Sequence, residues 1–170
     1  MPAPIVSMED RHLVKVREIF FESSLKKTFK DENEREAFFY KYLGFYLTHH
    51  PDLCFVYEDD KVLGYVVGAV DSKGEELLRI QPHLNVFQKY FKNYPAHLHI
   101  NCHKDARGKG VGTKLVHEIE KRFREQGASG LHIMTGVDSA NQSFYKKLGF
   151  DFAVKEDFGG SSILLMGKSL

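Results

Sequence analysis

The chain of 170 residues has ordinary globular proportions, with 42% hydrophobic residues, 28% charged residues and a net charge of +1. Its length predicts one domain, residues 1–170, because single cores typically run to about 100–200 residues. The balanced charge argues against a dedicated nucleic-acid binder, which usually carries a strongly basic face. The longest apolar or glycine run, Leu63 to Val70, is far shorter than the roughly 20 residues of a membrane helix. We therefore expect neither nucleic acid nor a membrane as a partner.

The N-terminus and the two cysteines predict a cytoplasmic protein. The first residues lack the basic and then apolar pattern of a signal peptide. Cys54 and Cys102 lie in apolar, strand-like runs, which is typical of buried free thiols in a reducing compartment.

Hydrophobic periodicity predicts an alternating series of strands and helices. In chain order, strands are expected at 5–8, 53–58, 62–70, 96–102, 131–137, 150–154 and 162–166. Helices are expected at about 9–21, 34–48 and 112–126, with a short one that a capping box at Ser139–Gln142 opens and Gly149 ends. No clear pattern assigns residues 71–94. The result is a mixed α/β (α+β) chain around one sheet.

The stretch between the strand 96–102 and the next helix carries the strongest chemical signal. It reads His103-Lys-Asp-Ala-Arg107-Gly108-Lys109-Gly110-Val111-Gly112. Three glycines permit backbone conformations and close approaches that side chains prevent. Peptide N–H groups at a helix N-terminus attract an anion. One nearby acid, Asp105, opposes the positive charge of four basic residues, namely Lys104, Arg107, Lys109 and Lys114. The loop therefore predicts a phosphate or pyrophosphate site, the alternative being a plain turn with solvated lysines.

Two common nucleotide motifs do not fit this loop. A P-loop needs Gly-x-x-x-x-Gly-Lys-Ser/Thr, which is absent. A dinucleotide fold needs Gly-x-Gly-x-x-Gly early in a parallel sheet, whereas these glycines come late and follow Gly-x-Gly-x-Gly. The string Arg107-x-x-Gly110-x-Gly112 instead resembles the pyrophosphate loop of the GNAT superfamily of N-acetyltransferases, which grips coenzyme A.

This resemblance covers nearly the whole chain in the right order. It includes the first strand and helix start at 5–10, the strand-to-loop passage at 100–107 and the later helix Asn141-x-x-x-Tyr145-x-x-x-Gly149-Phe150. The stretches 53–60, 64–71 and 167–170 resemble more closely the acetyltransferase-like C-terminal domain of O-GlcNAc hydrolases. The implied fold is a GNAT-like mixed, mostly antiparallel twisted sheet of about six to seven strands, flanked by about four helices.

The resemblance implies acetyl-CoA as co-substrate and no metal. Carried over by position, the residues expected to bind acetyl-CoA are Cys102, His103, Lys104, Arg107, Gly108, Lys109, Gly110, Val111, Gly112, Asn141 and Tyr145. The loop amides from Arg107 to Gly112 would hold the pyrophosphate. The backbone of Cys102 and Lys104 would pair with the pantetheine arm and polarise the thioester carbonyl.

Two side chains are candidates for proton transfer. Tyr145 is the expected general acid for the coenzyme A thiolate, with Asn141 on the same helical face; the alternative is that Tyr145 only packs. His97, His99 and His103 alternate along one strand, and His99 is the candidate base, with ordered water as the alternative. The three histidines lack a Cys, Asp or Glu set of metal-site spacing, so no metal is expected there.

The leading hypothesis is therefore an acetyl-CoA-dependent N-acetyltransferase acting on a primary amine, either a small molecule or a protein lysine. The aromatic face of the second predicted helix, Phe38, Tyr42, Phe45 and Tyr46, would form core or border the acceptor pocket. A non-catalytic module that binds acetyl-CoA or a protein partner is the second hypothesis, and another acyl donor the third. The resemblance also makes a homodimer one expectation for the assembly.

Overall fold

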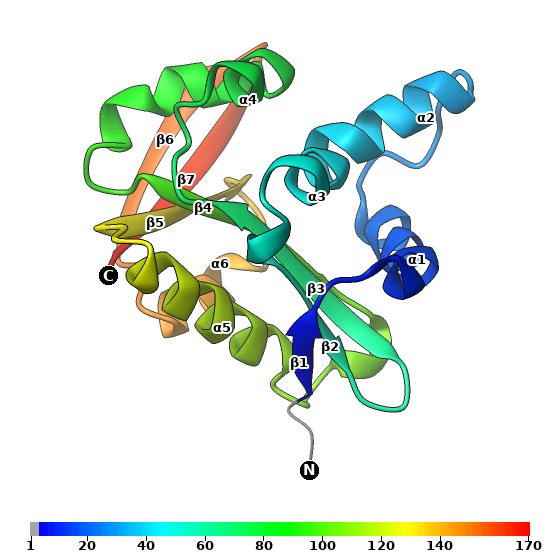
Figure 1. Cartoon of the computed structure of the whole chain (residues 1–170). Helices are drawn as coiled ribbons and strands as arrows, with labels where there is room; N and C mark the ends of the chain where they lie inside the picture. Colours follow the sequence, from blue (N-terminus) through cyan, green and yellow to red (C-terminus); the bar gives the residue numbers. More distant parts are fainter. Residues whose placement is uncertain (1–3) are drawn as a thin grey trace. The chain divides into compact units, whose positions relative to one another are not determined.

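The computed structural model describes residues 4–170 and confirms a mixed α/β fold (Figure 1). Within these residues, seven strands form one sheet in the order β1-β2-β3-β4-β5-β7-β6, with six α-helices. Residues 1–3, which belong to the signal-peptide argument, lie outside the described part. The chain divides into two compact units: the residues up to Gly68 with His99–Lys121, and Ala69–Leu98 with Arg122–Leu170.

The first unit begins with a short strand and three helices that precede a buried hairpin. Its elements are β1 (Ile5–Ser7), α1 (Leu13–Ser23), α2 (Glu32–Phe39), α3 (Phe45–His49), β2 (Cys54–Glu58), most of β3 (Val62–Ala69), the end of β4 (Ala96–Cys102) and most of α5 (Val111–Glu125). β2 pairs antiparallel with both β1 and β3. Every residue of β3 is buried, as expected for a strand covered on both faces.

Gly64 allows β3, β4 and α5 to approach closely in the first unit. A Cβ on this glycine would lie 3.0 Å from Cys102 Sγ and 3.1 Å from Leu115 Cδ1. Cys102 therefore lies on the α5 side of the sheet. Because strand side chains alternate, Tyr65 and Asn101 face the opposite side. Two faces of this unit are thus distinguished, one covered by α5 and the other facing α2 and α3.

The second unit is built on antiparallel pairing around one long strand. It contains α4 (Glu75–Ile80), a 3-10 segment (Pro82–Tyr90), β5 (Gly130–Gly136), α6 (Gln142–Lys147), β6 (Phe152–Phe158) and β7 (Ser161–Ser169). β7 pairs antiparallel with β5 and with β6, and the start of β4 pairs parallel with β5. Gly167 is required where Tyr94 crosses the sheet, because a Cβ there would lie 2.8 Å from the Tyr94 ring.

Most sequence predictions of element type are confirmed, and four details differ. The second predicted helix is α2 and α3 with a π turn at Tyr40–Gly44 between them. The unassigned segment 71–94 contains α4 and a 3-10 helix. With the division into α2 and α3, the described residues have two more α-helices than expected. The predicted strand 150–154 runs to Phe158, and Gly159 and Gly160 make the turn with positive φ.

The predicted capping box at Ser139–Gln142 is wrong. α6 begins at Gln142, with Asn141 in the N-cap position and no side-chain cap bond. The Ser139 hydroxyl instead donates to Asn141 Oδ1 at 2.8 Å, and its oxygen accepts the Asn141 N–H at 3.4 Å, before the helix begins. The Gln142 side chain donates to the carbonyls of Gly136 and Val137. Local side-chain bonds in the turn have replaced the cap.

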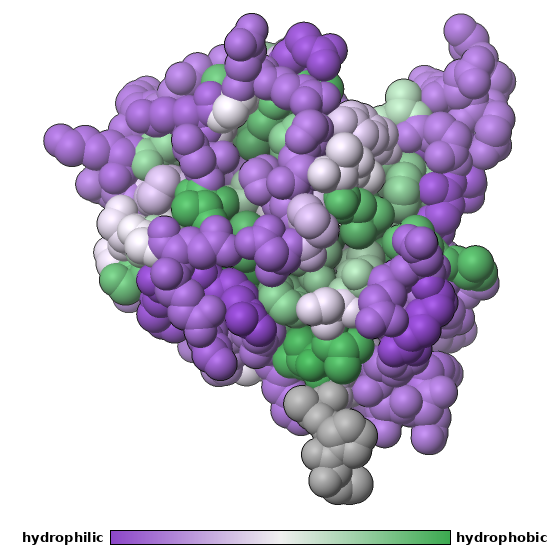
Figure 2. Space-filling view, viewed as in Figure 1, coloured by the Kyte–Doolittle hydropathy of each residue, from purple (hydrophilic) through white to green (hydrophobic). Residues whose placement is uncertain are grey.

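The surface is largely hydrophilic in the view of Figure 2, with scattered hydrophobic areas. This agrees with the 28% of charged residues in the sequence. Among residues 4–170, no helix is both long and apolar enough to cross a membrane.

Candidate functional site

The glycine-rich loop has the backbone conformation that its sequence predicts. Gly108 and Gly110 have φ angles of 73° and 69°, in the left-handed region that side chains disfavour. α5 starts directly afterwards at Val111, which is 1% exposed and anchors the start of this 15-residue helix. The first N–H groups of a helix have no partner within it, so they can bind an anion at this end.

The side chains of the loop add positive charge that the loop's only acid does not cancel. Lys104, Arg107 and Lys109 are exposed and form no ion pair with any of the described residues. Asp105 is paired with Lys61, and this contact holds the pKa of the Asp105 carboxyl below its ordinary value. The charge of Asp105 is therefore largely balanced by a residue of the β2–β3 turn, which leaves the loop cations for a ligand.

His103 shapes the entry to the loop. Its backbone N–H donates to Leu63 O at 2.8 Å, which extends the pairing with β3. Because backbone groups alternate along a strand, the N–H and C=O of Cys102 point away from β3. The His103 side chain accepts the Asp105 N–H at 3.2 Å and caps the 3-10 turn Lys104–Ala106. The His103 imidazole thus has a structural role, whereas its predicted contact with acetyl-CoA stays a prediction.

Both cysteines are free thiols, as expected, but only Cys54 is fully buried. Burial raises the pKa of Cys54 to about 12 and that of Cys102 to about 11. Cys102 is partly exposed at the end of β4, next to the loop. With its thiol protonated at neutral pH, Cys102 is not an activated nucleophile.

Opposite α5, the first unit carries two polar pairs that involve tyrosine hydroxyls. His99 Nε2 lies 3.0 Å from Tyr46 Oη, and the Asn101 amide donates to Tyr65 Oη at 2.7 Å. Both tyrosines are buried, and burial raises the pKa of Tyr65 further above its ordinary value, so its hydroxyl stays neutral. His99 and Asn101 lie two residues apart on the same face of β4.

The residues of the predicted aromatic face of the second helix lie partly in the core and partly beside His99. Phe45 and Tyr46 are buried, as the core interpretation requires. Tyr42 is only half-buried, and its ring centroid lies 5.9 Å from that of His99. Sequence analysis did not identify Tyr46 or Tyr65 as partners of β4. The pairing depends on which strand and helix face each other, and no local pattern encodes that.

Tyr145 and Asn141 belong to the second unit, on and before α6. Tyr145 is 7% exposed, and its ring packs edge-on against Phe144 and Phe150 at 5.1 and 5.4 Å between centroids. The exposed Asn141 accepts hydrogen bonds from Thr135 and Ser139. Local packing holds the Tyr145 ring firmly, and its role as general acid stays a prediction.

The strand histidines do not form a metal site in the described residues. His97 lies 2.6 Å from Ser72 Oγ and is 3% exposed, while His99 and His103 have the separate contacts given above. Across residues 4–170, no group of three or more His, Cys, Asp or Glu side chains is placed to hold a metal ion.

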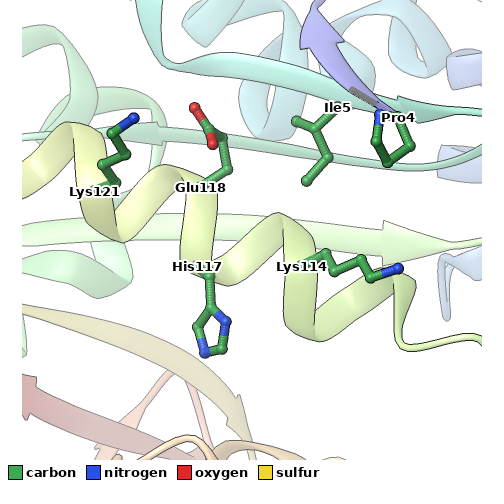
Figure 3. A pocket seen from close by; sticks show the side chains of 6 residues that line it. All are labelled: Pro4, Ile5, Lys114, His117, Glu118 and Lys121. Atoms are coloured by element: carbon green, nitrogen blue, oxygen red, sulfur yellow. The ribbon is translucent and has the colours of Figure 1, made fainter. Parts of the chain in front are cut away.

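A shallow hollow of about 550 Å³ lies between β1 and α5, and its lining contains none of the predicted acetyl-CoA residues (Figure 3). The residues that line it are Pro4, Ile5, Lys114, His117, Glu118 and Lys121. Its rim mixes basic and acidic side chains, and in Figure 3 His117 points away from Ile5. This arrangement lacks the convergent polar groups of a specific small-molecule site.

Comparison with known proteins gives consistent results. A family model described as "Acetyltransferase (GNAT) family" matches residues 13–150. The chain is 29% identical over 125 residues to acetyltransferase SG1711 of Sodalis glossinidius, covering 73% of this chain and 70% of that protein.

Solved structures share the fold at lower sequence identity. SsHAT matches with a TM-score of 0.76 at 20% identity, covering 99% of this chain and 98% of that one. The yncA protein of Salmonella typhimurium, solved with its cofactor acetyl-CoA, matches with a TM-score of 0.65 at 17% identity, covering 100% and 95%. The closer resemblance to O-GlcNAc hydrolase domains stays a prediction.

Proposed function

Because the chain belongs to the GNAT family of acetyltransferases, we propose that it transfers the acetyl group of acetyl-CoA to a primary amine. The observation that carries this proposal is the loop at the start of α5. Two left-handed glycines, a buried helix start at Val111 and three unpaired cations form a site suited to a pyrophosphate. The acceptor is a small-molecule amine or a protein lysine. Cytoplasmic location and a homodimer stay predictions from the sequence.

In the proposed reaction, the acceptor amine attacks the thioester of acetyl-CoA directly. The neutral amine nitrogen bonds to the thioester carbonyl carbon, the carbon–sulfur bond breaks, and the nitrogen loses one proton. We assign Tyr145 as the acid that protonates the departing thiolate and His99 as the base that receives the amine proton. The backbone of Cys102 and Lys104 would stabilise the developing negative charge on the carbonyl oxygen.

The loop assignment is tested by calorimetric titration of acetyl-CoA into the wild type and into Gly110→Glu. We expect the dissociation constant to rise about tenfold or more in this variant, because a carboxylate would face the pyrophosphate. A matched control is Gly159→Glu in the β6–β7 turn. Both glycines have positive φ and nothing within 4 Å of a built Cβ, so the strain and the added charge are the same.

Two results of this titration would count against the loop. One is binding that survives Gly110→Glu, and the other is equal loss of binding in Gly159→Glu. If the wild type binds neither acetyl-CoA nor coenzyme A, the enzyme proposal fails and the non-catalytic module becomes the better hypothesis.

Tyr145→Phe then separates an enzyme from a binding module. If Tyr145 is the general acid, kcat falls about 100-fold while the acetyl-CoA dissociation constant is unchanged. The rate is followed as thiol release with a panel of primary amines. An unchanged kcat would remove Tyr145 from the mechanism and leave the interpretation that its ring only packs against Phe144 and Phe150.

A further inference from the structure

The hydrogen bond between His99 and Tyr46, like the one between Asn101 and Tyr65, joins β4 to a buried tyrosine hydroxyl in the first unit. The two partners are far apart in the sequence, and Tyr46 is 0% exposed. His99 itself is only partly buried. A buried hydroxyl therefore holds one ring nitrogen of an imidazole that is accessible to a ligand.

A π turn directly precedes the helix α3 that carries this hydroxyl. The helix that starts with α2 widens at Tyr40–Gly44 before it continues as α3 at Phe45. π turns are rare, and they occur frequently at functional sites. Here the widened turn places two tyrosines against one histidine. The ring centroids of Tyr42 and Tyr46 lie 5.9 and 5.4 Å from that of His99, both at steep interplanar angles.

Only one of these two tyrosines bonds the imidazole through its hydroxyl. Tyr46 Oη lies 3.0 Å from His99 Nε2, whereas Tyr42 contacts His99 through its ring. A hydroxyl can donate to a bare ring nitrogen or accept from a ring N–H, so the contact with Nε2 is compatible with both tautomers of a neutral imidazole. A base role for His99 requires the tautomer in which Nε2–H donates to Tyr46 Oη and Nδ1 keeps its lone pair for the proton.

We propose that Tyr46 is the positioning residue of His99: its hydroxyl oxygen accepts Nε2–H, holds the imidazole in one orientation and leaves Nδ1 as the nitrogen that receives a proton. This inference rests on the proposed function, in which His99 receives the amine proton. The hydroxyl comes from α3, directly after the π turn at Tyr40–Gly44. Tyr46 acts through His99 and need not touch the substrate.

The experiment compares the wild type with Tyr46→Phe and with Tyr42→Phe as the matched control. Each variant removes one hydroxyl and keeps a ring beside His99. In protein with ¹⁵N-labelled histidine, the imidazole nitrogen shifts report the tautomer, and His99→Gln assigns the signals by their loss. We expect the Nε2–H tautomer to dominate in the wild type and in Tyr42→Phe, and a larger share of the Nδ1–H tautomer in Tyr46→Phe. A dominant Nδ1–H tautomer in the wild type would overturn the inference.

Kinetics supply the second readout with an amine that the wild type acetylates. In Tyr46→Phe, kcat should fall about two- to tenfold, in line with the change in tautomer population, while KM for acetyl-CoA stays constant. Tyr42→Phe should lower kcat less than Tyr46→Phe does, because it keeps the ring contact with His99 and removes no hydrogen bond to the imidazole. Equal effects of the two variants on kcat would overturn the inference, because they would indicate a general packing role.

The two proposals fail in different experiments. A wild-type spectrum with both tautomers, or one that Tyr46→Phe leaves unchanged, overturns the positioning role of Tyr46. A wild type that does not bind acetyl-CoA overturns the proposed function, and calorimetry measures this independently of the histidine spectrum.

Discussion

His132 is the residue whose environment departs most from what its place in the sequence indicates. It lies on β5 with its ring stacked on Phe91 at 4.9 Å between centroids, and it is 1% exposed. Its Nδ1 lies 2.7 Å from Tyr94 O, so this nitrogen carries the hydrogen and donates it. Nε2 is buried with no hydrogen-bond partner among the described residues. Burial lowers the pKa of His132 to about 4, and the ring is neutral in the folded protein.

We expect this histidine to make the fold sensitive to mild acid. Its pKa is depressed on folding, so the unfolded chain takes up the proton first. The associated stability is complete above pH 6.5 and is lost as the pH falls from there toward 4. At pH 5 the loss is on the order of 2 kcal/mol relative to neutral pH. Urea unfolding measured from pH 7.5 to pH 4.5 gives this dependence.

His132→Phe tests whether His132 causes this pH dependence of the unfolding free energy. A ring that cannot take up a proton should flatten the pH dependence of the unfolding free energy between pH 6.5 and 4.5, whatever its effect on absolute stability. His117→Gln on the exposed side of α5 is the control and should keep the wild-type slope. The same slope in His132→Phe and in the wild type would assign the acid sensitivity to other groups.

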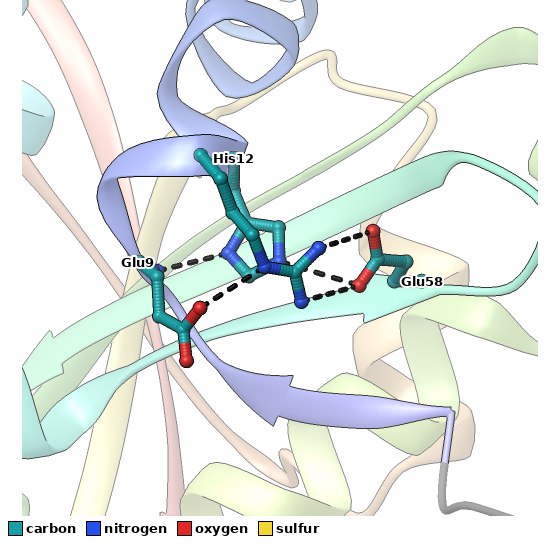
Figure 4. A network of polar contacts seen from close by, with 4 residues as sticks. Glu9, His12 and Glu58 are labelled. Carbon is teal, nitrogen blue, oxygen red and sulfur yellow. Dashed lines mark hydrogen bonds and ion pairs between the residues drawn. The ribbon is translucent and has the colours of Figure 1, made fainter.

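At the scale of elements, a part-buried hydrogen bond joins the first helical turn, Asp10–His12, to the end of β2 (Figure 4). The Glu9 N–H donates to His12 Nδ1 at 2.9 Å, so the ring hydrogen is on Nε2, which lies 3.3 Å from Glu58 Oε2. His12 is 1% exposed. Arg11 also binds both oxygens of Glu58, but it does so at the surface.

We expect Glu58→Ala to lower the free energy of unfolding by about 1–3 kcal/mol, because it leaves the buried His12 Nε2–H without an acceptor. Arg11→Ala is the control. It removes a solvent-exposed ion pair and should change stability much less. Chemical unfolding of both variants at neutral pH measures the difference. If Arg11→Ala lowers the free energy of unfolding as much as Glu58→Ala does, then the ion pair, and not the hydrogen bond of His12, stabilises the contact between these elements.

Helix periodicity predicts the type of an element, but it does not predict an irregular turn within that element. The spacing of Phe38, Tyr42, Phe45 and Tyr46 predicts a helix, and helical residues do occupy 32–49. The π turn inside it was not predicted, since one extra residue in a turn hardly changes a pattern of apolar side chains. α4 and the 3-10 segment after it were missed because their buried residues are few and irregularly spaced, namely Leu77, Leu84 and Phe87.

At the scale of the molecule, the single domain predicted for residues 1–170 can be tested by unfolding. The boundaries of the two compact units cut through β3 between Gly68 and Ala69, through β4 between Leu98 and His99, and through α5 between Lys121 and Arg122. Neither unit therefore contains all of its own secondary structure. Since two strands and a helix are divided between the units, we expect the chain to unfold in one cooperative transition.

Urea denaturation followed by far-UV circular dichroism and by tyrosine fluorescence tests this expectation. The chain has 8 tyrosines and no tryptophan, so fluorescence samples many positions. The two curves should coincide. Gly167→Ala, which forces a Cβ against the Tyr94 ring in the second unit, should shift both curves equally. Two separate midpoints would contradict the single-domain prediction.

The sequence by itself determined the order of most elements, the loop Arg107–Gly112 and the family. These features are local, because glycine spacing, charge and apolar periodicity act on neighbouring residues. Only the tertiary structure decided that Tyr46 bonds His99, that Tyr65 bonds Asn101 and that the buried His132 Nε2 has no hydrogen-bond partner within residues 4–170. These contacts join residues that are distant in the chain. They arise from strand pairing and from the way a widened helix packs, which no single stretch of sequence encodes.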